Sequence, residues 1–229
     1  MNNTDKRKKA FKELISKNFN DKHQTDKEYL RDKANNSIIS DKKYHSEIQP
    51  FYDHLFMITV MYKRSNAYNI NALDNHITRI NNDFYELHKI ICKLMIKGNI
   101  NRQKILQPYC FMFIDGASTR SGGYFKANRA GENTHHHGVM LLHPDILKKL
   151  DLAELNNKLN YQTKNCNNIQ SIEIKNLPTH KDFISAVDYS QKLATPLITN
   201  PNIYADLFFV LPHTNNNQMD KLLGRSSAS

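Results

Sequence analysis

Cysteine is scarce in this chain of 229 residues, and long apolar runs are absent from it. Its 3 cysteines, Cys92, Cys110 and Cys166, lie far apart and include no C-x-x-C pair. The sequence therefore supports neither a disulfide framework nor a thiolate zinc site. No stretch approaches the roughly eighteen consecutive apolar residues that span a bilayer, and residues 1–9 lack the apolar segment of a secretory signal. We therefore expect a cytoplasmic protein with no membrane partner.

Apolar and basic residues, by contrast, are plentiful. Hydrophobic residues make up 39% of the chain and aromatic residues 10%, enough for a sizeable core and too many for full-length disorder. The chain has 32 lysines and arginines against 22 acidic residues, a net charge of +10. Such an excess favours a polyanionic partner, because it raises the rate of encounter with nucleic acid or an acidic membrane surface.

The distribution of charge and apolar residues predicts three segments. Residues 1–45 form a basic, polar extension, residues 46–213 one folded domain, and residues 214–229 a polar tail. Within the extension, Phe11, Leu14, Ile15 and Phe19 have near-helical spacing, which predicts one short amphipathic helix. A solvated basic arm is the alternative interpretation of the same segment.

Hydrophobic periodicity predicts alternating strands and helices within the domain. We expect strands at 54–62, 108–116, 134–143, 169–174 and 206–211, and helices at 73–94, 145–159 and 180–194. The order β-α-β-β-α-β-α predicts an α+β fold, a ferredoxin-like antiparallel sheet with helices packed on one face. The other face would then be open for a functional site.

Three consecutive histidines begin the predicted strand at 134–143. Side chains alternate along a strand, so His135 and His137 share a face with Cβ atoms about 7 Å apart, while His136 points the other way. Asp115, at the end of the preceding strand, is the preferred third ligand, and Glu132 is its rival. Imidazole and carboxylate ligands suit Mg²⁺ or Mn²⁺, ahead of Zn²⁺. The alternative is that the histidines are simply solvated at the start of a strand.

A tyrosine and a lysine lie three residues apart on the last predicted helix. That spacing brings the Tyr189 phenol beside the Lys192 ammonium, away from the apolar stripe of the helix. A tyrosine can attack a phosphodiester with help from a metal, and a neighbouring cation can steady the phosphate.

The long loop after residue 116 has a composition suited to single-stranded nucleic acid. Arg120, Lys126 and Arg129 can contact phosphates, while Tyr124 can stack on an exposed base. A solvated surface loop is the alternative.

Taken in order, these features resemble those of the HUH endonucleases, and more closely the Rep branch, the initiators of rolling-circle replication. The matching residues are an apolar strand containing FMITV, His135-His136-His137-Gly138 at the head of another strand, and Tyr189-Ser190-Gln191-Lys192 on a helix. Relaxases of the superfamily usually place the tyrosine ahead of the histidines, so the order here favours Rep-type or transposase-type members.

The resemblance implies a bacterial, phage-encoded or plasmid-encoded enzyme that nicks single-stranded or hairpin DNA at a replication origin. Tyr189 would be the nucleophile, forming a 5′-phosphotyrosine intermediate and a free 3′-OH. His135 and His137 would bind the divalent metal, and Lys192 would assist at the phosphate. Two features depart from the family pattern: His136 replaces the usual bulky apolar residue, which opens a shifted register for the ligand pair, and no G-x-x-x-x-G-K-[ST] motif follows. A separate helicase and a polymerase would therefore be required.

Other functions remain open from the sequence. An HUH transposase or mobilisation relaxase would use the same chemistry on other DNA ends. A non-catalytic, basic nucleic-acid-binding regulator could hold a structural metal with its histidines. An unrelated metal-dependent hydrolase would turn over without any covalent adduct.

Overall fold

The structure is a computed structural model, and it describes residues 3–36, 54–63, 70–115, 134–164, 168–190 and 208–212. The strands are β1 (Leu55–Tyr62), β2 (Tyr109–Asp115), β3 (His135–Leu141), β4 (Ile169–Asn176) and β5 (Phe208–Leu211). The helices are α1 (Asn3–Asn36), α3 (Ile70–Met95), α4 (Pro144–Leu147), α5 (Leu152–Thr163) and α6 (His180–Ser190). Two short 3-10 helices, η2 (Ile100–Arg102) and η3 (Lys104–Leu106), follow α3.

All five strands join one sheet in the order β4-β1-β3-β2-β5, and every neighbouring pair is antiparallel. The first four strands, with α3 between β1 and β2 and α5 between β3 and β4, have the β-α-β-β-α-β arrangement of a ferredoxin-like sheet. The predicted α+β fold class is therefore confirmed. β5 adds a fifth strand beside β2.

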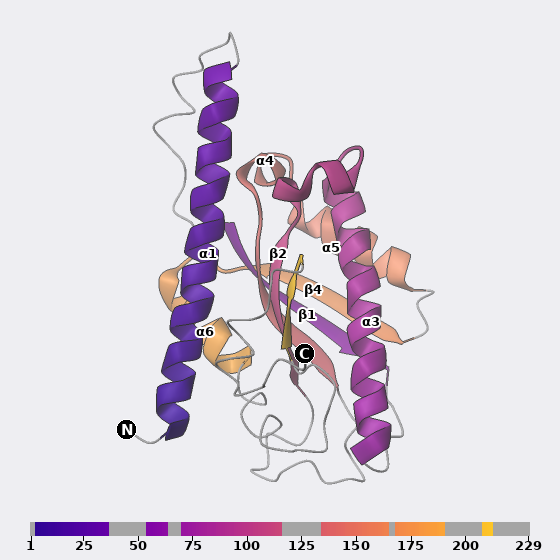
Figure 1. Ribbon diagram of the computed structural model, residues 1–229. Coiled ribbons are helices and arrows are strands. Elements are labelled where there is room, and N and C mark those ends of the chain that lie inside the picture. Colours follow the sequence, from indigo (N-terminus) through magenta and orange to yellow (C-terminus); the bar gives the residue numbers. More distant parts are fainter. Residues whose placement is uncertain are drawn as a thin grey trace, which may run out of the picture.

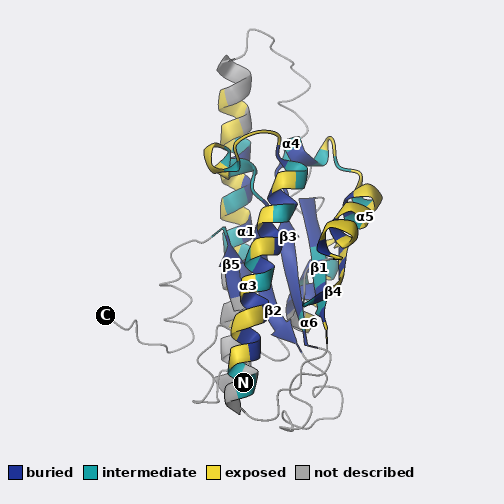
Figure 2. Ribbon diagram, turned by 90° about the vertical axis from the view of Figure 1, so that its right-hand side faces the viewer, coloured by how far each residue is buried: buried dark blue, intermediate teal, exposed yellow. Residues whose placement is uncertain are grey.

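One face of the sheet is covered by α3 and α5 (Figure 1). The apolar positions that predicted the first long helix turn inward: Ile77, Ile80, Phe84 and Ile91 on α3 are fully buried. They pack against the even-numbered side chains of β1 and β2, because alternate residues of a strand share a face. We call this cluster the first core. Figure 2 shows the strands buried behind the exposed outer side of α3.

The opposite face is also partly covered, by α1 and α6 (Figure 1). A second core forms there from the odd-numbered residues of β2 and β3 together with Ile15 and Phe19 of α1 and Phe183 and Val187 of α6. On β4, however, the side chains of this face are exposed, namely Ser171, Glu173 and Lys175. The open face expected from the sequence is thus found on β4, but it is closed over β2 and β3.

Helix α1 spans 34 residues and is far longer than the short helix predicted from its apolar spacing. Phe19 anchors it to the sheet, since its ring lies 5.6 Å from Tyr109, 5.9 Å from Phe111 and 5.7 Å from Phe183. Further along, the half-buried Lys22 pairs with buried Asp26 and donates to the Ile105 carbonyl oxygen at 3.1 Å. The helical interpretation of this segment is therefore the one that the structure supports. None of the helices in the described ranges is both long and apolar enough to cross a membrane.

The helix predicted at 145–159 is two helices, α4 and α5. The break occurs where the Asp151 side chain accepts a hydrogen bond from the Glu154 amide at 2.9 Å, capping the start of α5. His143 caps α4 in the same manner through the Asp145 amide. Two caps within nine residues specify two helix starts, whereas apolar periodicity alone runs through both.

Candidate metal centre and tyrosine

The pairing of β2 with β3 brings three potential ligands to one place. Asp115 lies directly opposite His135, and Phe113 lies opposite His137. Because these residues have the same parity, all of them face the side of the sheet on which the second core forms. Asp115, His135 and His137 form a group whose ligand atoms all lie within 4.8 Å of one another. The preferred carboxylate of the sequence prediction therefore joins the histidines, while its rival Glu132 lies outside the described residues.

The three ligand atoms converge. The Nε2 atoms of His135 and His137 are 2.5 Å apart, and each lies 3.7 Å from Oδ2 of Asp115. The two imidazole planes are almost perpendicular, at 89°. The side chains are mostly shielded from solvent, with exposed fractions of 14% for His135 and 7% for Asp115 and His137.

This arrangement fits a divalent cation. A point equidistant from three atoms with these separations lies about 2 Å from each, the length of a bond from Mg²⁺ or a first-row metal to oxygen or imidazole nitrogen. Two imidazoles and one carboxylate leave room for further ligands, as in sites where a metal acts on a substrate. The predicted histidine pair and Asp115 can therefore hold a metal ion.

His136 points to the other face, which decides the register of the ligand pair. It is fully buried in the first core, where Nε2 lies 2.9 Å from Oδ1 of Asn81 and Nδ1 lies 2.7 Å from the Tyr62 hydroxyl. Because the amide oxygen can only accept, Nε2 carries the proton and Nδ1 accepts from Tyr62. Burial, with the nearby histidines His135, His137 and His76, lowers the pKa of His136 to about 3, so the ring is neutral. The shifted register is excluded by this geometry.

Gly138 follows the ligand pair at a point of close strand approach. A Cβ atom there would overlap the Phe111 carbonyl oxygen and the Met112 sulfur on β2. The absence of a side chain therefore lets β2 and β3 pair normally next to His137, where Gly138 lies opposite Met112.

Tyr189 lies beside the histidines. Helix α6 packs on the second core through Phe183, Ala186 and Val187, and Tyr189 lies off that stripe with 36% of its surface exposed. Its ring centroid is 4.9 Å from that of His137, with the planes inclined at 70°. The sequence placed the tyrosine away from the helix core, and the structure adds that its ring contacts His137.

The remaining predicted site residues cannot be placed. Lys192 and the loop residues Arg120, Tyr124, Lys126 and Arg129 lie outside the described residues. Their roles stay predictions.

One neighbour of the site was missed from the sequence. Thr59 on β1 lies directly opposite His137, and its Oγ1 is 3.3 Å from His137 Nδ1. Within the sequence it belongs to an apolar run and is separated from His137 by 78 positions. Only the strand register identifies it, and no signal in the local sequence could have done so.

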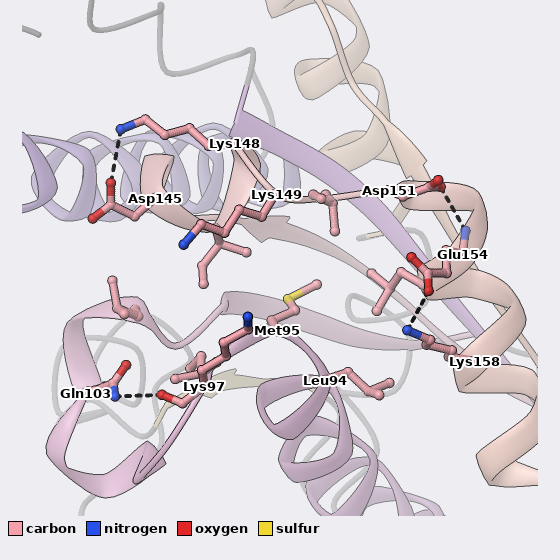
Figure 3. A pocket seen from close by; sticks show the side chains of 15 residues that line it. Leu94, Met95, Lys97, Gln103, Asp145, Lys148, Lys149, Asp151, Glu154 and Lys158 are labelled. Atoms are coloured by element: carbon pink, nitrogen blue, oxygen red, sulfur yellow. Dashed lines mark hydrogen bonds and ion pairs between the residues drawn. The ribbon is translucent and has the colours of Figure 1, made fainter.

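A cavity of about 430 Å³ lies near the end of β3, away from the ligand group (Figure 3). Its walls are the end of α3, the α4 turn and the start of α5. Its acidic groups are engaged locally: Asp145 pairs with Lys148 at 3.1 Å and Glu154 with Lys158 at 2.6 Å. The cavity brings no histidine or cysteine together with these acids, so the candidate chemistry is at the Asp115 end of the sheet.

Comparisons with known proteins give no assignment: no family model matches the sequence, and neither a curated protein nor a solved structure matches it significantly.

Proposed function

We propose that this protein is a metal-dependent endonuclease and strand transferase of the HUH type that nicks single-stranded DNA through Tyr189. The observation that carries the proposal is the position of the Tyr189 ring, 4.9 Å from the ring of His137. A metal-ligand cluster alone is compatible with many functions, but phosphoryl transfer to a phenol needs an accessible tyrosine near the metal, and Tyr189 is exposed and contacts one of the ligand histidines. The order of the motifs in the chain supports the same interpretation.

A divalent ion bound by Asp115, His135 and His137 would polarise the scissile phosphate and offset its negative charge. The Tyr189 oxygen attacks phosphorus, and a new O–P bond forms as the bond from phosphorus to the 3′ oxygen breaks. The phenol proton passes to water at the exposed side of Tyr189, and the released 3′ oxygen takes up a proton from water. The products are a 5′-phosphotyrosine link and a free 3′-OH.

The surrounding chain provides positioning. His137 contacts both Tyr189 and the ligand group, so one strand orients the nucleophile relative to the phosphate site. On the same face, Ser171, Glu173 and Lys175 of β4 are exposed, and we propose that a strand of DNA reaches the site across them. Lys192 would contact the phosphate, and Arg120, Tyr124, Lys126 and Arg129 would hold the strand. We propose a replication origin as the target, with helicase and polymerase supplied by other proteins; transposon or transfer-origin ends would use the same chemistry.

The test is trapping of the covalent adduct. The protein is incubated with Mn²⁺ or Mg²⁺ and a 3′-labelled pool of single-stranded DNA with a randomised centre, since the fragment joined to tyrosine retains the 3′ end. A labelled, protein-sized band that survives denaturation and disappears with EDTA is expected. Tyr189→Phe should abolish it. Tyr161→Phe is the matched control, because Tyr161 is 79% exposed on α5, a helix of the opposite face.

The other outcomes separate the alternatives. Cleavage without an adduct indicates a water-activating hydrolase at the same metal site. An adduct that persists in Tyr189→Phe assigns the nucleophile elsewhere. DNA binding without cleavage in a randomised pool, which contains every short site, favours the non-catalytic regulator.

A further inference from the structure

Thr59 is a polar neighbour of the candidate metal centre, and its contact bears on how His137 can bind a metal. Thr59 Oγ1 lies 3.3 Å from His137 Nδ1, while Nε2 of the same ring faces Asp115 and His135. An imidazole can coordinate a metal only through an unprotonated nitrogen, so the ring proton must then be on Nδ1. With the proton there, Nδ1–H can donate a hydrogen bond to the Thr59 hydroxyl oxygen.

We propose that Thr59 is a positioning residue of the metal centre: its hydroxyl oxygen accepts a hydrogen bond from Nδ1–H of His137, which favours the tautomer with the proton on Nδ1 and keeps Nε2 aimed at the metal. The inference rests on the metal-binding part of the proposed function and is independent of whether Tyr189 attacks DNA. Partners of this kind fix both the tautomer and the orientation of ligating histidines.

The strand register makes this contact specific. Thr59 is the direct cross-strand partner of His137, and the residues that precede and follow it on the same face of β1 are Met57 and Met61. Neither thioether is a strong acceptor, and on the other side His137 is paired with Phe113 of β2. Thr59 is therefore the one cross-strand neighbour of His137 in β1 and β2 with a hydroxyl.

The two ligand histidines differ in their neighbours, which explains why His137 in particular needs a positioning residue. His135 lies opposite Met61 on β1 and opposite the carboxylate of Asp115 on β2. In contrast, His137 is the ligand that also contacts Tyr189, so rotation of its ring would disturb both the metal and the nucleophile. Fixing this ring is the contribution of Thr59.

The experiment compares Thr59→Val with wild type by Mn²⁺ titration, following free Mn²⁺ by electron paramagnetic resonance. Valine keeps the shape and the β-branching but removes the acceptor, so the affinity should fall by about 10- to 100-fold. Thr59→Ser should restore it to within about threefold of wild type. Ser171→Val is the matched control, because it makes the same loss of a hydroxyl on the same face, at an exposed position of β4, and should leave affinity unchanged.

Two further readouts separate positioning from a structural role. The metal-free variants should unfold at the same denaturant concentration as wild type, within error. If an adduct forms in the wild type, Thr59→Val should require a higher Mn²⁺ concentration for half-maximal adduct formation, and Thr59→Ser should require the wild-type concentration. Unchanged Mn²⁺ affinity in Thr59→Val, or an equal loss in Thr59→Ser, would overturn the proposal. Absence of the tyrosine adduct with intact Mn²⁺ effects would remove the nuclease and leave this inference standing.

Discussion

Replacement of His136 by leucine tests the assignment of the three adjacent histidines. Leucine puts a bulky apolar residue between the ligands but removes the shared hydrogen-bond partner of Tyr62 and Asn81. The Tyr62 hydroxyl would lose the acceptor 2.7 Å away, and Asn81 would lose a donor at 2.9 Å. Tyr62 is only 2% exposed and Asn81 5%, so water cannot readily replace the lost bonds.

The expected cost follows from these two groups. A buried polar group left without its hydrogen bond costs about 1–3 kcal/mol, and the apolar side chain of leucine offsets part of the total. We expect the free energy of unfolding to fall by about 2–4 kcal/mol. Adding Tyr62→Phe to the leucine variant should recover about 1 kcal/mol, because the phenylalanine has no hydroxyl to leave unsatisfied.

Metal binding, unlike stability, should not change in His136→Leu. His136 faces the first core, so once folded, His136→Leu should bind Mn²⁺ as wild type does. His135→Leu is the matched variant: it should lose Mn²⁺ binding while changing stability much less, since its side chain lies at the rim of the sheet with 14% exposed. Urea unfolding and Mn²⁺ titration of both proteins form the assay. Loss of Mn²⁺ binding in a stable His136→Leu protein would refute the register of the ligands.

Three more predictions follow from named contacts. Gly138→Ala should destabilise the protein by about 1–3 kcal/mol or more and weaken Mn²⁺ binding, because the added methyl overlaps β2 backbone; normal stability by denaturant unfolding would contradict this. His135→Ala should abolish cleavage but retain most DNA affinity in a binding assay, because affinity rests mainly on phosphate contacts; equal loss of both would indicate a structural metal. Burial lowers the pKa values of His23 and His76 to about 4, so each binds a proton more readily in the unfolded chain. The free energy of unfolding should therefore decrease as the pH falls from 6.5 to 4. His136, whose pKa is about 3, acts in the same direction, and buried Asp26, whose pKa is raised to about 6, opposes one of the three histidines below pH 6. The net loss is about 2.7 kcal/mol for each unit that the pH falls; a flat profile in urea melts would contradict these assignments.

Much of the fold could be predicted from periodicity because each element has one dominant apolar pattern. The α3 stripe and the continuous apolar run of β1 belong to elements buried in the first core. The pattern failed where polar residues are buried. Helix α1 presents His23 and Asp26 to the protein interior, so its inward face does not look apolar beyond Phe19. Its length and its packing on the sheet therefore could not be read from hydrophobicity.

The candidate site, too, has features that the local sequence predicts and features that it does not. Alternation along a strand is a local property, so the shared face of His135 and His137 and the opposite direction of His136 could be predicted. Pairing between strands is not local. That Asp115 lies opposite His135 required only the hairpin of β2 and β3, whereas Thr59 lies opposite His137 through a contact of β1 with β3. Residues contributed by distant strands are therefore the ones that sequence reasoning misses.

The three histidines illustrate why a short motif is ambiguous until burial is known. As a sequence, the triplet allows either adjacent or alternate residues to act as ligands. In the sheet, His136 is held neutral by burial and by two hydrogen bonds on the α3 side, so it cannot turn toward the metal without leaving both Tyr62 and Asn81 unsatisfied. These two hydrogen bonds also hold β3 in place from the face of the sheet opposite the metal site. A histidine can thus occupy the middle position, where the family that this sequence resembles usually has a bulky apolar residue, provided that the core on that face contains polar partners for both ring nitrogens.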